Sequence, residues 1–204
     1  ELCAKHDLII CSDEIHCDLV LPGYSHTPTA SISPEIASRT VTCIAPSKTF
    51  NLAGLSTSSV IITDPGLRKA FSRTLNNLHI GNGNIFGNIA SIAAYSSGAE
   101  WLGELLSYLN RNIELVTDYC SEKIPEIVPI RPEATYMIWL DCRKLRLPPA
   151  ELQKFFVKIA GVGMNEGSTF GPGGEGFMRM NIAASKAMVM KAMGQIEKAV
   201  MTLR

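Results

Sequence analysis

The stretch TVTCIAPSKTFNLAGL, residues 40–55, joins a strand signal to a candidate reactive side chain. Its first six residues are rich in β-branched side chains, which predicts a short strand. Lys48 follows this strand among small and polar residues, with Gly54 just beyond. A solvated lysine on a turn is the ordinary interpretation of such a position. The uncharged neighbourhood favours a reactive lysine instead, because desolvation lowers the pKa of a lysine and so promotes the neutral amine that can form a Schiff base.

A second stretch, DLIICSDEIHCDL, covers residues 7–19 and begins with a short apolar run. The run predicts a buried parallel strand whose carboxyl end delivers Asp13 and Glu14. These carboxylates could cap a turn, or they could serve a ligand, since α/β proteins place ligand groups at this edge. His16 and Asp18 complete a possible set of metal ligands. Alternate side chains of an extended segment point to opposite faces, so we predict no metal site here.

Predicted strands and helices alternate along the whole chain, which indicates an α/β or α+β fold. A boundary is expected within a long helix over 99–123, separating a piece of a parallel-sheet domain (1–105) from a smaller α+β domain (106–204). The predicted strands cover 7–12, 40–45, 59–63, 127–130, 136–140 and 177–182, and the predicted helices start at 33–34 and 64–65 or cover 85–97, 99–123, 148–159 and 185–203.

The composition is that of an ordinary globular protein, with 46% hydrophobic residues and a formal net charge of zero. Without a basic stripe, nucleic acid and anionic membranes are poor candidate partners. The six cysteines form no C-x-x-C pair, which favours reduced thiols and a cytoplasmic protein. The chain starts in the tail of a helix and has no initiator Met, so we expect it to be a fragment of a longer protein.

Arg179 lies within the apolar stretch FMRMN, residues 177–181. A guanidinium in such surroundings must meet an anion, either an internal carboxylate or that of a ligand. The sequence alone leaves both alternatives open.

Taken together, SDEIHCDL (12–19) and APSKTFNLAGL (45–55) resemble the fold-type I pyridoxal-phosphate (PLP) enzymes of the class I/II aminotransferase family. More narrowly, they are similar to the MalY/PatB-type cystathionine β-lyase branch. Further matches lie at 84–87, 131–136, 139–143, 161–163 and 179–183, so the resemblance covers essentially all 204 residues. It implies the C-terminal part of a PLP-transferase fold: part of the large, PLP-binding domain with its parallel or mixed sheet (1–105), then a small α+β domain (106–204).

The resemblance also implies a role for each candidate site residue. Lys48 would bind PLP covalently and then move the α-proton of the substrate. Asp13 would pair with the pyridine nitrogen, and Ser47 would contribute to phosphate binding. His16 would bind the cofactor where many relatives carry a tyrosine near the ring's 3-oxygen. Arg179 would clamp the α-carboxylate of an amino-acid substrate.

The implied enzyme is a PLP-dependent C–S β-lyase. We expect the chain to be truncated at its N-terminus, since the family carries a long N-terminal portion with the main phosphate-binding loop. It would eliminate a thiol from a β-thio amino acid such as cystathionine, giving pyruvate and ammonia, and would work as a homodimer. The alternatives are a PLP-dependent aminotransferase, or a catalytically incomplete fragment that serves interaction. One departure from the family is that many aminotransferases place an arginine soon after the glycine that follows the lysine, here Gly54, whereas the stretch 54–59 contains none.

Overall fold

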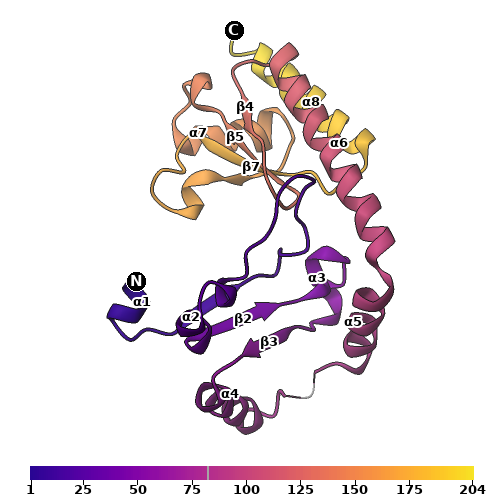
Figure 1. Ribbon diagram of the computed structural model, residues 1–204. Helices are drawn as coiled ribbons and strands as arrows, with labels where there is room; N and C mark the ends of the chain where they lie inside the picture. Colours follow the sequence, from indigo (N-terminus) through magenta and orange to yellow (C-terminus); the bar gives the residue numbers. More distant parts are fainter. Residues whose placement is uncertain (82) are drawn as a thin grey trace. The chain divides into compact units, whose positions relative to one another are not determined.

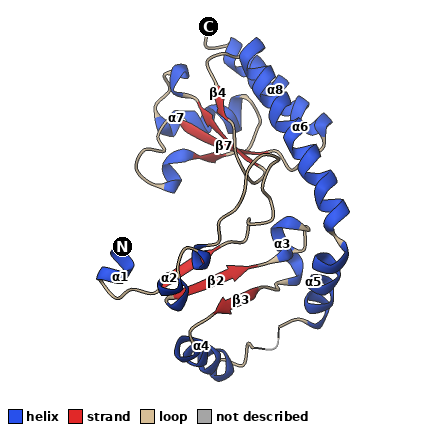
Figure 2. Ribbon diagram, in the orientation of Figure 1, coloured by secondary structure: helices blue, strands red, loops and turns tan. Residues whose placement is uncertain are grey.

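The computed structural model describes residues 1–81 and 83–204, which fold as two compact units, Glu1–Leu105 and Leu106–Arg204 (Figure 1). Each unit contains one β-sheet. The long helix α6, Ala99–Lys123, contributes residues to both units. Strands and helices alternate along the chain (Figure 2), which confirms the predicted α/β class.

The sheet of the first unit has the order β1-β2-β3, with β1 at Ile10–Asp13, β2 at Thr40–Ile44 and β3 at Ser59–Ile62. β1 and β2 are parallel, and Asp13 stands opposite Cys43. β3 runs antiparallel to β2, so the sheet is mixed. Because β1 and β2 are parallel, their carboxyl ends meet at one edge of the sheet, where the polar residues of both predicted motifs follow.

β1 starts three residues later than the predicted strand. The preceding helix α1, Leu2–Lys5, ends in a tight turn in which the Leu8 amide donates to the Cys3 carbonyl at 2.8 Å. Asp7 adopts a left-handed φ of 49° in this turn. Extended pairing therefore begins only once the chain has left the turn.

Two predicted helix starts are confirmed by their caps. Ser33 accepts a hydrogen bond from the Ile36 amide at 3.2 Å, and Asp64 accepts one from the Leu67 amide at 2.7 Å. In both helices a proline follows the cap, where its missing N–H costs nothing. The helices of the first unit, with its short 3₁₀ turns, are α2 (Pro34–Ser38), α3 (Pro46–Thr49), α4 (Pro65–Asn77), α5 (Ile85–Ser97), η1 (Thr29–Ser31) and η2 (Ala53–Leu55).

The sheet of the second unit is antiparallel in all its pairings and has the order β4-β5-β7-β6. β4 covers Val128–Ile130, β5 covers Met137–Asp141, and β7 covers Phe177–Asn181. The strand β6, Asn165–Glu166, was not predicted from the sequence, because two residues carry no periodic signal. The other elements are η3 (Arg143–Leu145), α7 (Pro149–Lys154), η4 (Phe155–Ile159), η5 (Gly167–Phe170) and α8 (Lys186–Met201).

The core of the second unit is formed by the buried faces of two helices, α6 and α8, and of two strands, β5 and β7. Buried residues of α6 and α8 recur every three or four positions, and those of β5 and β7 recur every second position. The core side chains on these elements, all between 0 and 4% exposed, include Leu109, Ile113, Val116, Cys120, Ile138, Leu140, Met178, Met180, Val189, Met193, Ile196 and Val200.

Among the helices of the described residues, none combines the length and the hydrophobicity that a membrane span requires.

Candidate active site

Two neighbouring strand ends bring Asp13 and Lys48 to the same edge of the first sheet. Asp13 is the last residue of β1, and Cys43, opposite it, is the penultimate residue of β2. Ala45 is still extended, and α3 then begins at Pro46. Ser47 and Lys48 therefore lie in the first helical turn beyond the strand, at the edge where Asp13 ends β1.

α3 is a single turn whose limits follow from local chemistry. Pro46 suits the first helical position, and its carbonyl accepts from the Phe50 amide at 2.8 Å. Asn51 ends the turn with a left-handed φ of 56°. Lys48 is exposed and Ser47 half-buried, and within the described residues neither side chain forms a hydrogen bond or ion pair. Both polar groups are thus available to a ligand.

Asp13 and His16 lie on the turn that leaves β1. The Asp13 side chain is exposed, and its Oδ1 accepts from the Ile15 amide at 3.3 Å. His16 is half-buried, and its carbonyl accepts from the Leu19 amide at 3.0 Å. Four of the five predicted site residues, Asp13, His16, Ser47 and Lys48, thus belong to the first unit.

A buried carboxylate beside Asp13 has a fuller set of partners than the sequence suggested. Glu14 is only 7% exposed, and its Oε1 accepts from the Thr29 amide at 3.0 Å and from the Ser12 hydroxyl at 2.9 Å. His26 Nε2 lies 2.8 Å from its Oε2. Burial alone would raise the Glu14 pKa, but the bonds from His26, Thr29 and Ser12 outweigh it and hold that pKa below its usual 4.5.

α3 is also fixed from its far side. Thr49 is fully buried, and its hydroxyl donates to Asp18 Oδ2 at 3.1 Å. The Phe50 ring packs edge-on against Tyr95 of α5 at 5.7 Å and lies 5.8 Å from Trp101 of α6. Burial and the nearby Asp18 carboxylate raise the pKa of Tyr95 to about 12. No role for Thr49, Phe50 or Tyr95 could be predicted, because the partners that they contact lie far away in the sequence.

Arg179, the fifth predicted residue, lies on β7 in the second unit. Its Nη2 donates to Asn165 Oδ1 at 3.1 Å, and its guanidinium carbon lies 4.5 Å from the centre of the Phe170 ring. The Nε atom is buried and has no hydrogen-bond partner among the described residues. No carboxylate in the described part of the chain pairs with Arg179. Of the two anions that the sequence left open, that of a ligand therefore fits this arginine better.

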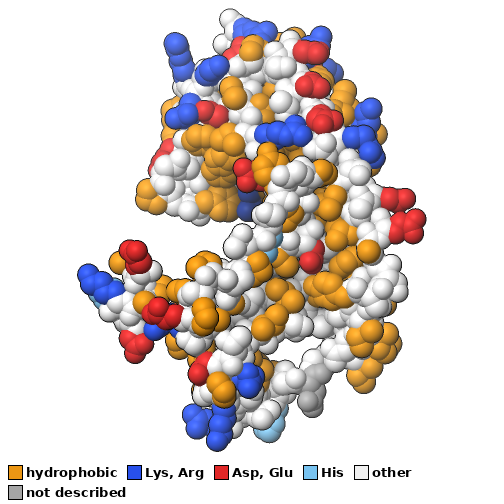
Figure 3. Space-filling model, in the orientation of Figure 1, with side chains coloured by type: hydrophobic (Ala, Val, Ile, Leu, Met, Phe, Trp, Pro, Cys, Tyr) orange, Lys and Arg blue, Asp and Glu red, His pale blue; other side chains and the backbone are white. Residues whose placement is uncertain are grey.

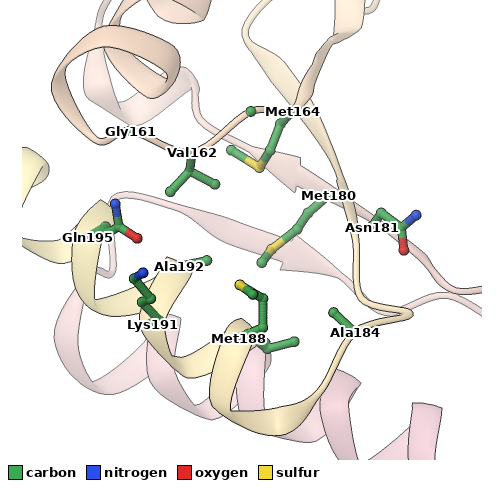
Figure 4. A pocket seen from close by; sticks show the side chains of 12 residues that line it. Gly161, Val162, Met164, Met180, Asn181, Ala184, Met188, Lys191, Ala192 and Gln195 are labelled. Atoms are coloured by element: carbon green, nitrogen blue, oxygen red, sulfur yellow. The ribbon is translucent and has the colours of Figure 1, made fainter.

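A separate cavity of about 390 Å³ lies in the second unit, between α8 and the segment before β6 (Figure 4). Met180 lines it, and Met180 and Arg179 are adjacent on β7, so their side chains point to opposite faces of the sheet. Neither Arg179 nor its contacts Asn165 and Phe170 are among the residues that line the cavity. Its walls are Gly161, Val162, Gly163, Met164, Met180, Asn181, Ala184, Met188, Val189, Lys191, Ala192 and Gln195.

The pattern of one protein family, described as aminotransferase class I and II, matches residues 1–196. The match includes both strand ends and β7, and so all five candidate residues. The chain belongs to this family.

Two relatives indicate which branch of the family the chain resembles. The chain is 44% identical, over 98% of its length, to cystathionine β-lyase PatB of Bacillus subtilis (strain 168), of which it covers 51%. It is 30% identical over its whole length to protein MalY of Escherichia coli (strain K12) and covers 52% of it. These findings confirm the resemblance to the cystathionine β-lyase branch.

The fold has a solved counterpart. The crystal structure of cystalysin from Treponema denticola, which contains pyridoxal 5′-phosphate, matches the whole chain with a TM-score of 0.95 and 34% identity. The chain covers 52% of that structure. It thus spans about half the length of the relatives it matches.

Proposed function

We propose that this chain is the lysine-bearing part of a PLP-dependent C–S β-lyase. The reaction is the α,β-elimination of a β-thio amino acid such as cystathionine to pyruvate, ammonia and a thiol. The observation that carries the proposal is the placement of Lys48 and Asp13. A primary amine without a partner among the described residues and an exposed carboxylate follow two parallel strands at one sheet edge. This donor set fits an aldehyde cofactor with a basic ring nitrogen.

Each residue has a role that its surroundings support. Lys48 Nζ would bind the cofactor covalently, and its amine, once the substrate amine displaced it, would accept the α-proton of the substrate. Asp13 would hold a proton on the pyridine nitrogen, and the cofactor, when bound, would supply an electron sink for the α-carbon. The Ser47 hydroxyl would bind the phosphate, and His16 would contact the ring near its 3-oxygen. Arg179 would bind the substrate α-carboxylate through its guanidinium, whose Nε has no partner among the described residues.

We also propose that the protein acts as a cytoplasmic homodimer. A row of apolar side chains on α5, Ile85, Ile89 and Ile92, is between 61 and 75% exposed, and neighbouring Phe86 is 75% exposed. Hydrophobic side chains gather on the surface at this helix (Figure 3). Apolar patches of this kind favour burial against another protein surface, here a second copy. The mass of the protein in solution, measured by light scattering, tests the dimer.

The cofactor assignment is tested by trapping. The chain is incubated with PLP and reduced with borohydride, and the masses of its proteolytic peptides are measured by mass spectrometry. We expect the added mass on the peptide that carries Lys48, none in Lys48→Ala, and an undiminished adduct in Lys69→Ala, which changes an exposed lysine of α4. An adduct that is still formed in Lys48→Ala would contradict the assignment of Lys48 as the lysine that binds PLP.

The reaction class is tested with cystathionine. A lyase releases pyruvate without any added keto acid, whereas an aminotransferase requires one. We therefore expect pyruvate from cystathionine and PLP alone, and its loss in Lys48→Ala. A strict requirement for a keto acid would favour the aminotransferase, and a chain that forms the adduct but releases no pyruvate would be catalytically incomplete.

A further inference from the structure

The polar cluster around Glu14 occupies the chain segment next to a proposed cofactor contact. Glu14 directly follows Asp13, and its amide donates to the Cys43 carbonyl at 2.9 Å, so that the bonding between β1 and β2 extends one residue past β1. We propose that Glu14 is a positioning residue, whose buried carboxylate clasps the end of β1 and so holds Asp13 in place for the pyridine nitrogen. The role of Asp13 in this inference rests on the proposed function.

The clasp acts from the face of the strand opposite to Asp13. Successive side chains of an extended segment point to opposite faces, so Ser12 and Glu14 share one face and Asp13 points to the other. The bond of 2.9 Å from the Ser12 hydroxyl to Glu14 agrees with this arrangement. Ser12 also lies 2.8 Å from the hydroxyl of Thr29. All partners of Glu14 therefore gather on one face and leave the other to Asp13.

The clasp also closes a long excursion of the chain. Residues 15–28 leave the strand end and return at Thr29, whose amide donates to Glu14 at 3.0 Å. His26 approaches the same carboxylate from within this excursion at 2.8 Å. Asp18 lies in the excursion as well and bonds to Thr49, the neighbour of Lys48. One buried side chain thus ties the excursion to the strand that ends in Asp13.

A carboxylate suits this task because it only accepts hydrogen bonds and has two oxygens for several donors. Thr29 and Ser12 share Oε1, while His26 takes Oε2. Alanine at this position leaves the half-buried Thr29 amide and the Ser12 hydroxyl without this acceptor. Glutamine keeps one oxygen for them and is the conservative variant.

The test compares PLP with 1-deaza-PLP, an analogue that carries carbon in place of the pyridine nitrogen. Asp13 can pair with the first but not with the second. If Glu14 acts through Asp13, Glu14→Ala lowers the affinity for PLP by roughly tenfold, the size expected for a lost charge-assisted hydrogen bond, and leaves that for the analogue nearly unchanged. Glu14→Gln should recover most of the preference for PLP. Glu35→Ala, an exposed acid of α2, is the control and should keep it. An equal loss for both ligands in Glu14→Ala would overturn the positioning role.

A second measurement uses the chain without any cofactor. Hydrogen exchange at the amides of residues 13–19 and 26–29 should speed up in Glu14→Ala and stay unchanged in Glu35→Ala. Unchanged exchange in Glu14→Ala would overturn the clasp itself. If the wild-type chain takes up neither PLP nor the analogue, the proposed function fails. Faster exchange in Glu14→Ala would then still support the clasp at the end of β1.

Discussion

The hydroxyl of Thr49 donates a hydrogen bond to Asp18, with Oγ1 and Oδ2 3.1 Å apart. The bond joins the residue after Lys48 to the segment that follows Asp13, so the two halves of the candidate site support each other. Thr49 is fully buried, which shields the bond from competing water. A half-buried carboxylate with a buried donor depends on that donor more strongly than a surface group does.

Replacing Thr49 with Val removes the hydroxyl and keeps the shape of the side chain. Asp18 then loses a donor, and we expect the free energy of unfolding to fall by about 1–3 kcal/mol. Urea denaturation of the whole chain measures the change. Thr49→Ser keeps the hydroxyl and should lose less stability than Thr49→Val. If both variants were equally stable, the bond would contribute nothing.

The Glu14 carboxylate predicts a contribution to stability that depends on pH. Because its folded pKa lies below the usual 4.5, the folded state favours the charged form. This contribution is fully present above pH 4.5 and disappears as the pH falls through the lowered folded value. Glu14→Gln should therefore be less stable than the wild type near neutral pH, and the difference should shrink in acid.

Other acids also lose favourable partners in acid, because Asp141 beside Arg143 and Glu126 beside Arg204 have lowered pKa values as well. The comparison between wild type and Glu14→Gln removes their shared effect. Urea unfolding at a series of pH values gives the difference directly. A difference that stayed constant down to about pH 3 would contradict the lowered pKa of Glu14.

Gly87 allows the start of α5 to contact the segment after Gly54. A Cβ on Gly87 would overlap Thr57 Oγ1 and would lie 2.9 Å from the Leu55 carbonyl oxygen. Gly87→Ala must displace this backbone, and we expect a loss of about 1–3 kcal/mol in the free energy of unfolding. Gly103→Ala on α6 meets nothing within 4 Å and should be neutral or stabilising. Equal stability of the two variants would show that the segment Leu55–Thr57 shifts to accommodate a Cβ on residue 87 at no cost in free energy.

The parts of the fold that could be predicted from the sequence are those with a local cause. Ser33 and Asp64 are caps followed by proline, and both cap the helices expected of them. The strand before Lys48 was recognisable from its β-branched residues. The two-residue strand β6 lacks such a signal, because its identity comes from pairing with β7.

The partners of the site residues are harder to predict for the same reason. Glu14 and His26 are 12 residues apart, and their contact depends on how the intervening chain turns back. Arg179 donates a hydrogen bond to Asn165 of β6, the strand that pairs with β7. Such contacts become visible only when the register of the strands is known. The resemblance to a family identified the residues, and the structure adds what surrounds them.

Asn112 on α6 ties the segment after β7 to the core of the second unit. Its buried side-chain amide donates to the carbonyl oxygens of Ile182 at 3.0 Å and Ala184 at 3.1 Å. The side chain is 2% exposed and Ile182 is fully buried, so the Ile182 carbonyl would find no water in its place. Asn112→Leu keeps the branched shape of the side chain but removes the donor of both carbonyls, and we expect a loss of about 2–4 kcal/mol in the free energy of unfolding.

The matched control for this prediction lies on the same helix. Asn110 bonds to Glu114 and Arg131 at the surface, where such contacts contribute little, so Asn110→Leu should change stability by less than about 1 kcal/mol. Urea denaturation compares the two variants, and hydrogen exchange at residues 182–184 reports the segment directly. We expect faster exchange there in Asn112→Leu only. A stable Asn112→Leu with unchanged exchange would show that other contacts hold the end of β7, the strand that carries Arg179.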